Sequence, residues 1–438
     1  MQDPRFQPTL PALHTRFRRH SLAISLVLPA IAGPVCLATA ADWPQFLGPH
    51  RNGSAPDVSL AAQWPESEPV VLWRKPVGQG WSGPVIQGEH LIAFHRLEDE
   101  EVVQCLDPMT GDLRWEFRDD TDYRDDFGFD AGPRATPAIA DGRVYTHGAD
   151  GALHCLDLES GAKLWSVDTR QRFDSPKGFF GRVCSPLVEG NAVILAIGGK
   201  EGAGIVAFDR NSGELLWKAT DEEAGYSSPV ATSIGAARRI LMFNRGGLVA
   251  IDPADGAVKF RFPWRSPIHA SVQAATPLVI GDRIFLSSTY DTGAALLQLR
   301  EDAAESVWSS DDRLSNHYAT SVHHDGFLYG FHGRQDIRPG ALLRCVELST
   351  GRVRWSHEGL GAGTVTLCGD DLLVLAENGE LLHIDASPER FNILNRAQVL
   401  GLDVRAHPAV AAGRMFARDK RNLIALDLPG TVRNPDNP

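Results

Sequence analysis

The segment Leu156–Trp165, which reads LDLESGAKLW, decides how this sequence folds. It contains the pattern Asp-x3-Gly-x3-Trp, here Asp157, Gly161 and Trp165. The pattern recurs, with one Phe for Trp and one Glu for Asp, at Asp107/Gly111/Trp115, Asp209/Gly213/Trp217, Asp252/Gly256/Phe260 and Glu347/Gly351/Trp355. Weaker copies run through Leu299–Trp308, around Asp385 and at Asp427. Self-similarity at a regular spacing is the sequence signature of a repeat architecture.

A second pattern precedes each copy: a small residue, Ser or Thr followed by Pro, an apolar pair, and then Gly with Asp. It occurs at Thr136-Pro137, Ser185-Pro186, Ser228-Pro229, Thr276-Pro277 and, with His in place of the hydroxyl residue, at His407-Pro408. Gly83-Pro84, Thr320-Ser321 and Thr364-Val365 occupy the matching places in the other copies. The two patterns together give eight copies, spaced about 38 to 52 residues apart, which is the length of a four-stranded propeller blade.

The sequence therefore predicts an all-β, eight-bladed propeller of four-stranded blades. We expect the Asp-x3-Gly element to form the turn between the third and fourth strands, since Gly permits a left-handed conformation and Asp bonds to nearby amides. The Trp then lies on the outer strand, where it can wedge between neighbouring blades.

The last copy ends near Leu428 and lacks an outer strand. Val70–Trp73, ahead of the first copy, can supply it, so we expect the N-terminal strand to close the ring. The predicted organisation is a signal peptide at 1–40, an N-terminal extension at 41–69, the propeller at 70–428 and a disordered tail at 429–438.

The N-terminus predicts export. Three arginines, Arg16, Arg18 and Arg19, precede the apolar run Leu22–Leu37 and the small residues Ala38-Thr39-Ala40, as in a cleaved signal peptide. An uncleaved anchor, and a twin-arginine instead of a general secretory route, remain alternatives. We expect a periplasmic or secreted protein, a monomer, with no membrane span after cleavage.

The composition and net charge exclude some classes of fold and of binding partner. Hydrophobic residues make up 43% and charged residues 22% of the 438, so the chain is neither disordered nor fibrous. Its formal net charge of −12 argues against binding to nucleic acid or an anionic membrane, which needs a basic face.

The repeats resemble the PQQ-like (quinoprotein-like) eight-bladed propellers. That family includes quinoprotein alcohol and polyvinyl-alcohol dehydrogenases and the BamB-like outer-membrane assembly lipoprotein. The resemblance implies the fold. The chain departs from the family in having no adjacent cysteines and no C-x-x-C-H haem segment, and Cys36 sits in a poor lipidation box. Repeat residues build blades, not sites, so the resemblance leaves the function open.

One repeat position should mark the mouth of the central channel. It is the residue three before each repeat Pro, at the top of the inner strand: Trp81, Arg134, Val183, Tyr226, Ala274, Tyr318, Ala362 and Arg405. Adding Arg182, one residue earlier in its copy, and Arg245 and Arg334 on loops between second and third strands gives the candidate ligand-binding residues Trp81, Arg134, Arg182, Tyr226, Arg245, Tyr318, Arg334 and Arg405. Aromatic faces and forked donors suit a planar or anionic ligand such as PQQ. Arginines that pair with aspartates and only plug the ring are the structural alternative.

Three functions follow. The first is a binding or scaffold module that holds a protein partner, or a small anionic or planar ligand, at the channel mouth. The second is a PQQ-dependent dehydrogenase in which Asp126, Asp130 or Asp336 acts as base beside a Ca²⁺-bound quinone. The acidic run Asp119–Asp126 offers oxygen ligands for Ca²⁺, although a solvated acidic loop is the default interpretation and no metal-ligand spacing stands out. The third is recognition of extracellular polysaccharide through Trp81, Tyr226, Tyr318 and Phe179.

Overall fold

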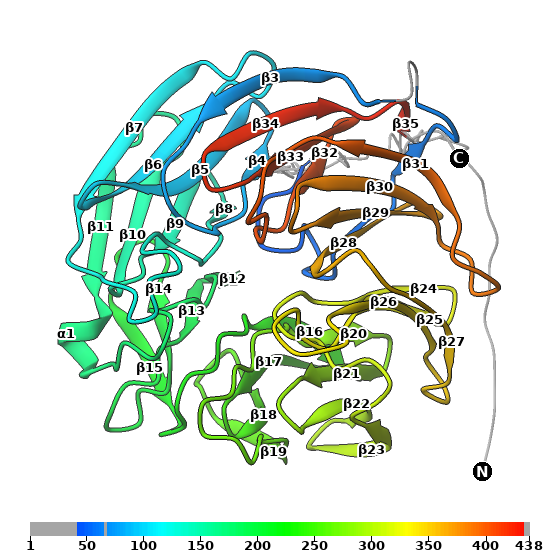
Figure 1. Cartoon of the computed structure of the whole chain (residues 1–438). Coiled ribbons are helices and arrows are strands. Elements are labelled where there is room, and N and C mark those ends of the chain that lie inside the picture. The colour runs from blue at the N-terminus through cyan, green and yellow to red at the C-terminus, as the bar shows by residue number, and fades with distance from the viewer. Residues whose placement is uncertain (1–41, 65–67, 433–438) are drawn as a thin grey trace, which may run out of the picture. The chain divides into compact units, whose positions relative to one another are not determined.

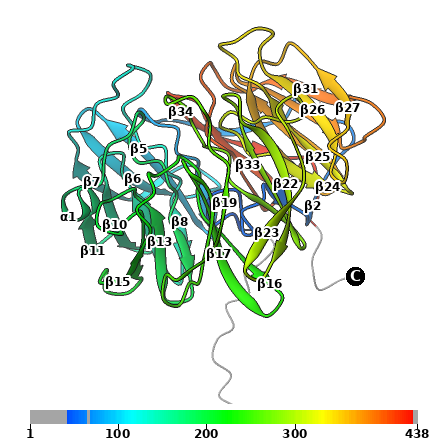
Figure 2. The same ribbon diagram turned by 90° about the horizontal axis from the view of Figure 1, so that it is seen from below.

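Eight four-stranded blades surround a central channel in the computed structural model, which describes residues 42–64 and 68–432 (Figure 1). The all-β, eight-bladed prediction is confirmed. The predicted signal peptide, residues 1–40, lies outside the described residues. Turning the ring by 90° shows the blades from the side, with the short helix α1 (Thr169–Phe173) at the outer edge (Figure 2).

Each blade is an antiparallel meander, and in blades 1 to 7 its four strands pair in chain order from the inner to the outer strand. Blades 1 to 4 comprise β4 (Val85–Gln87), β5 (His90–Leu97), β6 (Glu100–Leu106) and β7 (Leu113–Asp120); β8 (Ala138–Ala140), β9 (Arg143–His147), β10 (Ala152–Asp157) and β11 (Lys163–Asp168); β12 (Leu187–Glu189), β13 (Ala192–Ala196), β14 (Ile205–Asp209) and β15 (Leu215–Ala219); and β16 (Val230–Ile234), β17 (Ala237–Asn244), β18 (Gly247–Ile251) and β19 (Val258–Pro263).

Blades 5 to 8 follow the same order. They comprise β20 (Leu278–Ile280), β21 (Arg283–Ser288), β22 (Gly293–Arg300) and β23 (Ala303–Ser310); β24 (Val322–His324), β25 (Phe327–His332), β26 (Leu342–Glu347) and β27 (Val353–His357); β28 (Gly363–Cys368), β29 (Asp371–Ala376), β30 (Glu380–Asp385) and β31 (Ile393–Gln398); and β32 (Ala409–Ala411), β33 (Arg414–Arg418), β34 (Asn422–Asp427) and the N-terminal β3 (Val71–Pro76).

The ring closes as predicted. β3 pairs antiparallel with β34, placing Trp73 opposite Ala425, and becomes the outer strand of blade 8. The last blade thus combines one strand from the start of the chain with three from its end, which leaves no broken blade at the junction.

The Asp-x3-Gly element forms the turn between the third and fourth strands. In blade 2, Asp157 Oδ1 accepts a hydrogen bond from the Ser160 amide at 2.9 Å, and Gly161 has φ +72°. Gly161 N–H donates to the Asp157 carbonyl at 2.9 Å. The acidic side chain and the left-handed glycine together close the turn.

In five blades the repeat tryptophan packs against a glycine of the next blade. The Trp165 ring of blade 2 lies on Gly213 of blade 3, so close that a Cβ on Gly213 would come within 2.7 Å of it. Trp165 Nε1 also donates to the Arg210 carbonyl at 3.1 Å. The same ring-on-glycine contact occurs at Trp73/Gly111, Trp115/Gly161, Trp217/Gly256 and Trp308/Gly351. Glycine is therefore required at this position both by the left-handed turn and by the close tryptophan ring of the neighbouring blade.

The Ser/Thr-Pro pattern forms a belt of hydrogen bonds between inner strands. The Ser185 amide donates to Ser228 Oγ at 3.0 Å, and the Ser228 amide donates to Thr276 Oγ1 at 3.2 Å. Equivalent bonds run from Gly83 to Thr136, from Thr136 to Ser185, and from Thr276 to Thr320. Each hydroxyl thus satisfies a buried amide of the preceding blade.

Residues 43–55, which we call the strap, cross the ring among the inner strands (Figure 1). Trp43 forms a β-bridge with Ile86 of blade 1. Farther along, β1 (Ser54–Ala55) pairs in parallel with β28 of blade 7. Residues 43–55 of the extension predicted at 41–69 therefore lie among the inner strands of the ring.

Arg51 anchors the middle of the strap. Its guanidinium group donates to the carbonyl oxygens of Pro186 in blade 3 and of Pro229 in blade 4, the latter at 2.9 Å. Arg51 is 2% exposed, and burial lowers its pKa to about 10, so it stays charged at neutral pH. One cation thus ties two blades to the strap.

The predicted disordered tail begins too early. β35 (Gly430–Val432) pairs antiparallel with β2 (Val58–Leu60) of the extension, and the Ala61 amide donates to the Pro429 carbonyl at 2.6 Å. The backbone of this segment finds its partners in a stretch remote in sequence, which local composition does not reveal. Residues 433–438 lie outside the described part of the chain.

Candidate functional site

A cavity of about 700 Å³ opens at the channel mouth. Loops that enter the inner strands and loops between second and third strands provide its walls, and Phe46 of the strap also lines it. A second, smaller cavity of about 480 Å³ is lined by Gln45 and Arg51, also from the strap, and by blades 3 to 5. The strap therefore lies between the two, and the mouth cavity ends on it.

The predicted channel-mouth position leads to this cavity. Seven of its eight residues line the wall: Trp81, Arg134, Val183, Tyr226, Ala274, Tyr318 and Arg405. Ala362 is the exception and is buried at 4% exposure. Arg334 lines the cavity too. A position counted from the repeat proline thus locates the site, because each blade presents it at the same height.

Two predicted ligand-binding residues do not line the cavity. Arg182 donates to the Asp150 carbonyl at 2.8 Å and to Ser175 Oγ at 3.1 Å. Arg245 donates to the Ser271 carbonyl at 2.9 Å and forms an ion pair with Glu223. Both guanidinium groups are buried and hold loop backbone in place. Their loops fold back onto them, so both lie outside the cavity lining, and a ligand contact by either residue stays a prediction.

The arginines that do line the cavity have partners of their own. Arg134 donates to the carbonyls of Phe180 and Asp130, at 2.8 and 2.9 Å. Arg405 Nε lies 2.9 Å from Glu377 Oε1. The guanidinium carbons of Arg134 and Arg405 also lie 4.8 and 4.5 Å from the centre of the Trp81 ring, within range of cation–π attraction.

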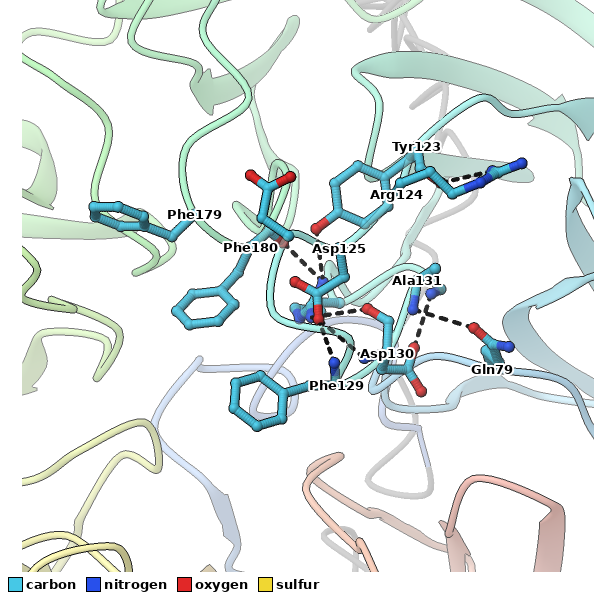
Figure 3. A network of polar contacts seen from close by, with 12 residues as sticks. Gln79, Tyr123, Arg124, Asp125, Phe129, Asp130, Ala131, Phe179 and Phe180 are labelled. Atoms are coloured by element: carbon cyan, nitrogen blue, oxygen red, sulfur yellow. Dashed lines mark hydrogen bonds and ion pairs between the residues drawn. The ribbon is translucent and has the colours of Figure 1, made fainter.

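A polar network holds the loop between blades 1 and 2 (Figure 3). Asp125 Oδ2 accepts from the amides of Phe129 and Asp130, at 2.6 and 3.1 Å. Asp125 is buried and lies 3.8 Å from Arg134. Gln79 accepts from the Ala131 amide at 3.1 Å. The network turns the Phe129 ring away from Gln79, to the same side of Asp125 as Phe179 and Phe180.

The three candidate bases do not gather at one point. Asp126 binds Lys177 at 2.6 Å on the surface, and Asp130 is buried, with its Oδ1 accepting from the Gly132 amide at 2.8 Å. Only Asp336 lines the cavity, and it is paired with Arg334. The sequence positions of these three aspartates in loops did not predict the directions of their side chains.

The acidic run that was considered for Ca²⁺ spreads in several directions. Asp119 contacts His154 at 3.1 Å and Asp122 contacts Arg170 at 2.9 Å. These pairings lower the pKa of both carboxyl groups, through the hydrogen bond from the basic partner. In the described ranges, no group of three or more His, Cys, Asp or Glu side chains is placed to hold a metal.

Aromatic side chains form the wall of the cavity at blades 1 to 4. The Phe127 ring lies 5.3 Å from that of Phe180, which lies 5.7 Å from Tyr226. Phe127 and Phe129 stack at 6.1 Å and remain 54% and 52% exposed. Large apolar side chains that are exposed together are typical of a ligand-binding or protein-binding surface.

The wall at blades 5 and 6 is polar. Tyr290 Oη lies 2.9 Å from His317 Nε2, and His317 Nδ1 lies 3.3 Å from Gln335 Oε1. Arg334 covers the Tyr290 ring at 4.3 Å. Burial lowers the pKa of His317 to about 4, so its ring is neutral at pH 7. Sequence reasoning assigned no role to any single residue of this Tyr–His–Gln chain, because these residues carry no repeat signature.

Tyr318 belongs to a second polar cluster beside it. Its hydroxyl donates to Glu377 Oε1 at 2.8 Å, the same oxygen that faces Arg405. Burial and the nearby Glu377 charge raise the pKa of Tyr318. Glu377, in the turn that follows β29, was not predicted, since that turn carries no repeat signature.

No helix in the described residues is long and apolar enough to cross a membrane.

Comparisons with known proteins agree with the fold. The outer membrane protein assembly factor BamB of Moranella endobia is 24% identical over 57% of this chain and 64% of its own length. The serine/threonine-protein kinase AfsK of Streptomyces coelicolor is 27% identical over 53% of this chain and 25% of the kinase. The quinoprotein alcohol dehydrogenase PedH of Pseudomonas putida is 30% identical over 24% of this chain and 17% of the enzyme. The chain therefore spans less than two thirds of each of these relatives.

Solved structures match over more of the chain. BamB of Moraxella catarrhalis superposes with a TM-score of 0.62 at 17% identity, over 82% of this chain and all of that one. A quinohemoprotein alcohol dehydrogenase of Comamonas testosteroni gives 0.65 at 15% identity, over 90% of this chain and 82% of that one. These similarities establish the architecture.

A family model described as outer membrane protein assembly factor BamB matches residues 98–357, more than half of the chain. The protein thus belongs to the BamB-like family of PQQ-like propellers.

Proposed function

We propose that this protein is an exported, periplasmic or secreted, binding module that holds its ligand or a partner segment in the mouth cavity. The observation that carries the proposal is the cavity itself: a 700 Å³ space with an exposed aromatic rim, ending on the strap. The BamB relatives are named outer membrane protein assembly factors, and a role in assembly is consistent with a binding module of this kind.

The alternative of a PQQ-dependent dehydrogenase fits these residues poorly. PQQ is a tricarboxylate and needs unengaged cationic donors. Arg334 is held by Asp336, Arg405 by Glu377, and Arg134 by two backbone carbonyls and Asp125. An acidic ligand would have to break these pairs inside the cavity. The described cysteines are buried, and none is adjacent to another.

A Ca²⁺-bound quinone with a nearby carboxylate base fits no better. A general base must lie within hydrogen-bond reach of the substrate hydroxyl. Asp336, the candidate at the cavity, has its pKa lowered by Arg334 and is engaged by it. The metal-ligating quinone chemistry of the named dehydrogenases therefore finds no matching set of side chains here.

The mouth is tested by cross-linking in the producing cells. A photo-reactive phenylalanine analogue replaces Phe129 at the rim or, as a control, Leu216, which is 47% exposed on the outer strand of blade 3. We expect a discrete adduct from position 129 only. Ala274→Trp, which fills the cavity from its wall, should abolish the adduct.

Equal cross-linking from both positions, or an adduct that survives Ala274→Trp, contradicts the proposal. A titration with PQQ and Ca²⁺ tests the enzyme alternative, following tryptophan fluorescence and the unfolding midpoint. We expect no change. Saturable quenching with a raised midpoint, lost in Arg134→Ala, would establish the quinone site instead.

A further inference from the structure

We infer that the mouth cavity binds an uncharged sugar unit of an oligosaccharide, with Tyr290 as its main polar anchor. This inference rests on the proposed binding function and names the chemistry of its ligand. It follows from three independent features: the two-sided character of the wall, the unused hydrogen-bonding capacity of the polar side, and the strained backbone of Tyr290.

The wall has one aromatic side and one polar side. Phe179, Phe180 and Tyr226 line the cavity from blades 2 to 4, while Tyr290, His317 and Gln335 line it from blades 5 and 6. A pyranose ring has the matching anatomy, with a C–H face that packs on aromatic rings and hydroxyls at its edge. A purely apolar ligand would leave the polar side without partners, at a cost for each buried group.

The polar side keeps both donors and acceptors for a ligand. With His317 neutral and its Nδ1–H directed to Gln335, Nε2 accepts from the Tyr290 hydroxyl. The Tyr290 oxygen then keeps lone pairs that can accept from a ligand hydroxyl. The Gln335 amide group keeps N–H donors, since only its oxygen is used in this chain. A group that both donates and accepts at neighbouring atoms, as a diol does, satisfies this pair.

The backbone of Tyr290 indicates that its position matters. Tyr290 and Asp291 both adopt the left-handed conformation, with φ +68° and +57°, in the hairpin between β21 and β22. A bulky aromatic residue is unfavourable there, and such strain concentrates at binding sites. Ser266 and Thr292 hydroxyls hold the Tyr290 carbonyl, at 2.6 and 3.1 Å. A Gly or Asn would turn this hairpin at lower cost, but would place no hydroxyl on His317.

Charge excludes a strongly acidic or basic ligand. Each cavity-lining arginine faces a carboxylate: Arg334 faces Asp336, Arg405 faces Glu377 and Arg134 faces Asp125. The three pairs balance, so neither sign is in excess at the wall. A neutral ligand gains most from such a site, because it leaves the pairs intact.

Calorimetric titration of the purified mature protein with neutral hexaoses (cello-, malto-, xylo- and N-acetylchito-hexaose) tests the inference. We expect at least one to bind with a Kd of millimolar or below. Tyr290→Phe, which keeps the ring, should weaken that binding at least tenfold, and Gln335→Leu should do likewise. Tyr145→Phe is the matched control: it removes a hydroxyl of blade 2 that is bonded to the Arg210 carbonyl of blade 3, and it should leave binding unchanged because Tyr145 does not line the cavity.

Three outcomes overturn the inference. The first is that no hexaose binds. The second is that oligogalacturonate binds more tightly than every neutral sugar. The third is binding that Tyr290→Phe and Tyr145→Phe affect equally, with both variants keeping the wild-type unfolding midpoint.

A separate probe keeps this failure distinct from failure of the binding function. An extended peptide alternating Phe and Ser is titrated in parallel. The cavity is a peptide site if the peptide binds, Ala274→Trp blocks that binding, and no sugar binds. In that case the sugar inference alone fails. If neither probe binds and the rim gives no adduct, both proposals fail.

Discussion

Arg51 of the strap donates a hydrogen bond of 2.9 Å to the carbonyl of Pro229, the residue that opens the inner strand of blade 4. The two residues are 178 positions apart in the chain, and the bond is buried. The strap therefore contacts several blades and does more than connect the N-terminus to the first blade. Replacing Arg51, which is buried, tests whether the strap stabilises the ring.

Arg51→Met should destabilise the ring by about 2–4 kcal/mol, because several buried carbonyls lose a charged donor. Urea unfolding followed by tryptophan fluorescence measures it. Arg300→Met is the control, since Arg300 is 57% exposed and forms only a 3.7 Å contact with Glu305. Similar unfolding midpoints for the two variants would show that the Arg51 contacts of the strap do not stabilise the ring.

Trp165→Ala should cost about 3–5 kcal/mol, as expected for removing a large side chain from a packed interface. Trp165 is 9% exposed and lies on Gly213. Gly213→Ala should also destabilise the protein, through its φ of +73° and the clash with the ring. A double-mutant cycle separates the two, because the clash disappears in the Trp165→Ala background. Strict additivity would mean that the two residues do not interact.

Ser228→Ala should cost about 1–3 kcal/mol, because it leaves the buried Ser185 amide without an acceptor. Ser228→Thr keeps the hydroxyl and should cost less. Urea unfolding of the two variants measures the difference. If alanine and threonine prove equivalent, the belt of hydroxyls is not a source of stability.

We expect the buried carboxyl group of Glu101 to lower the stability of the folded protein as the pH rises. It is 5% exposed, and burial, aided by the neighbouring Asp150 charge, raises its pKa from 4.5 to about 8. The folded state thus binds a proton that the unfolded state has released, so stability falls by up to about 1.4 kcal/mol per pH unit up to pH 8. The buried histidines contribute a slope of the opposite sign, which fades above pH 6.5, because their lowered pKa values keep them neutral in the folded state while the unfolded state still releases protons. This contribution is shared by the wild type and a Glu101 variant, so it cancels when the two are compared.

Relative to wild type, Glu101→Gln should remove the fall in stability that Glu101 contributes with rising pH, whereas Glu305→Gln, at a side chain that is 66% exposed, should leave the slope unchanged. Denaturant unfolding at pH 6.5, 7.25 and 8 measures both. An unchanged slope in Glu101→Gln would assign the pH dependence to other groups.

The repeat made the ring and the height of the mouth predictable, because the same residues build every blade. Trp81 and Arg405 belong to opposite ends of the chain, yet counting back from Pro84 and Pro408 placed both at the cavity. The arginine partners were not predictable, since Glu377 and Asp336 approach from loops without repeat signatures. The role of Phe46 and Arg51 was missed for the same reason, although Trp43-Pro44 and Gly48-Pro49 mark an unusual segment.

The strap and β3 have a consequence for how the molecule assembles. The first described residues of the chain pair with β34, β28 and β35, which are made near its end. Such contacts have large sequence separation, and contacts of that kind slow folding. Until the C-terminal strands are made, β3 and the strands β1 and β2 of the extension lack their partners, and unpaired strands of this kind favour aggregation. A chain delivered across a membrane before folding would meet both of its ends in the same compartment and complete the circle there.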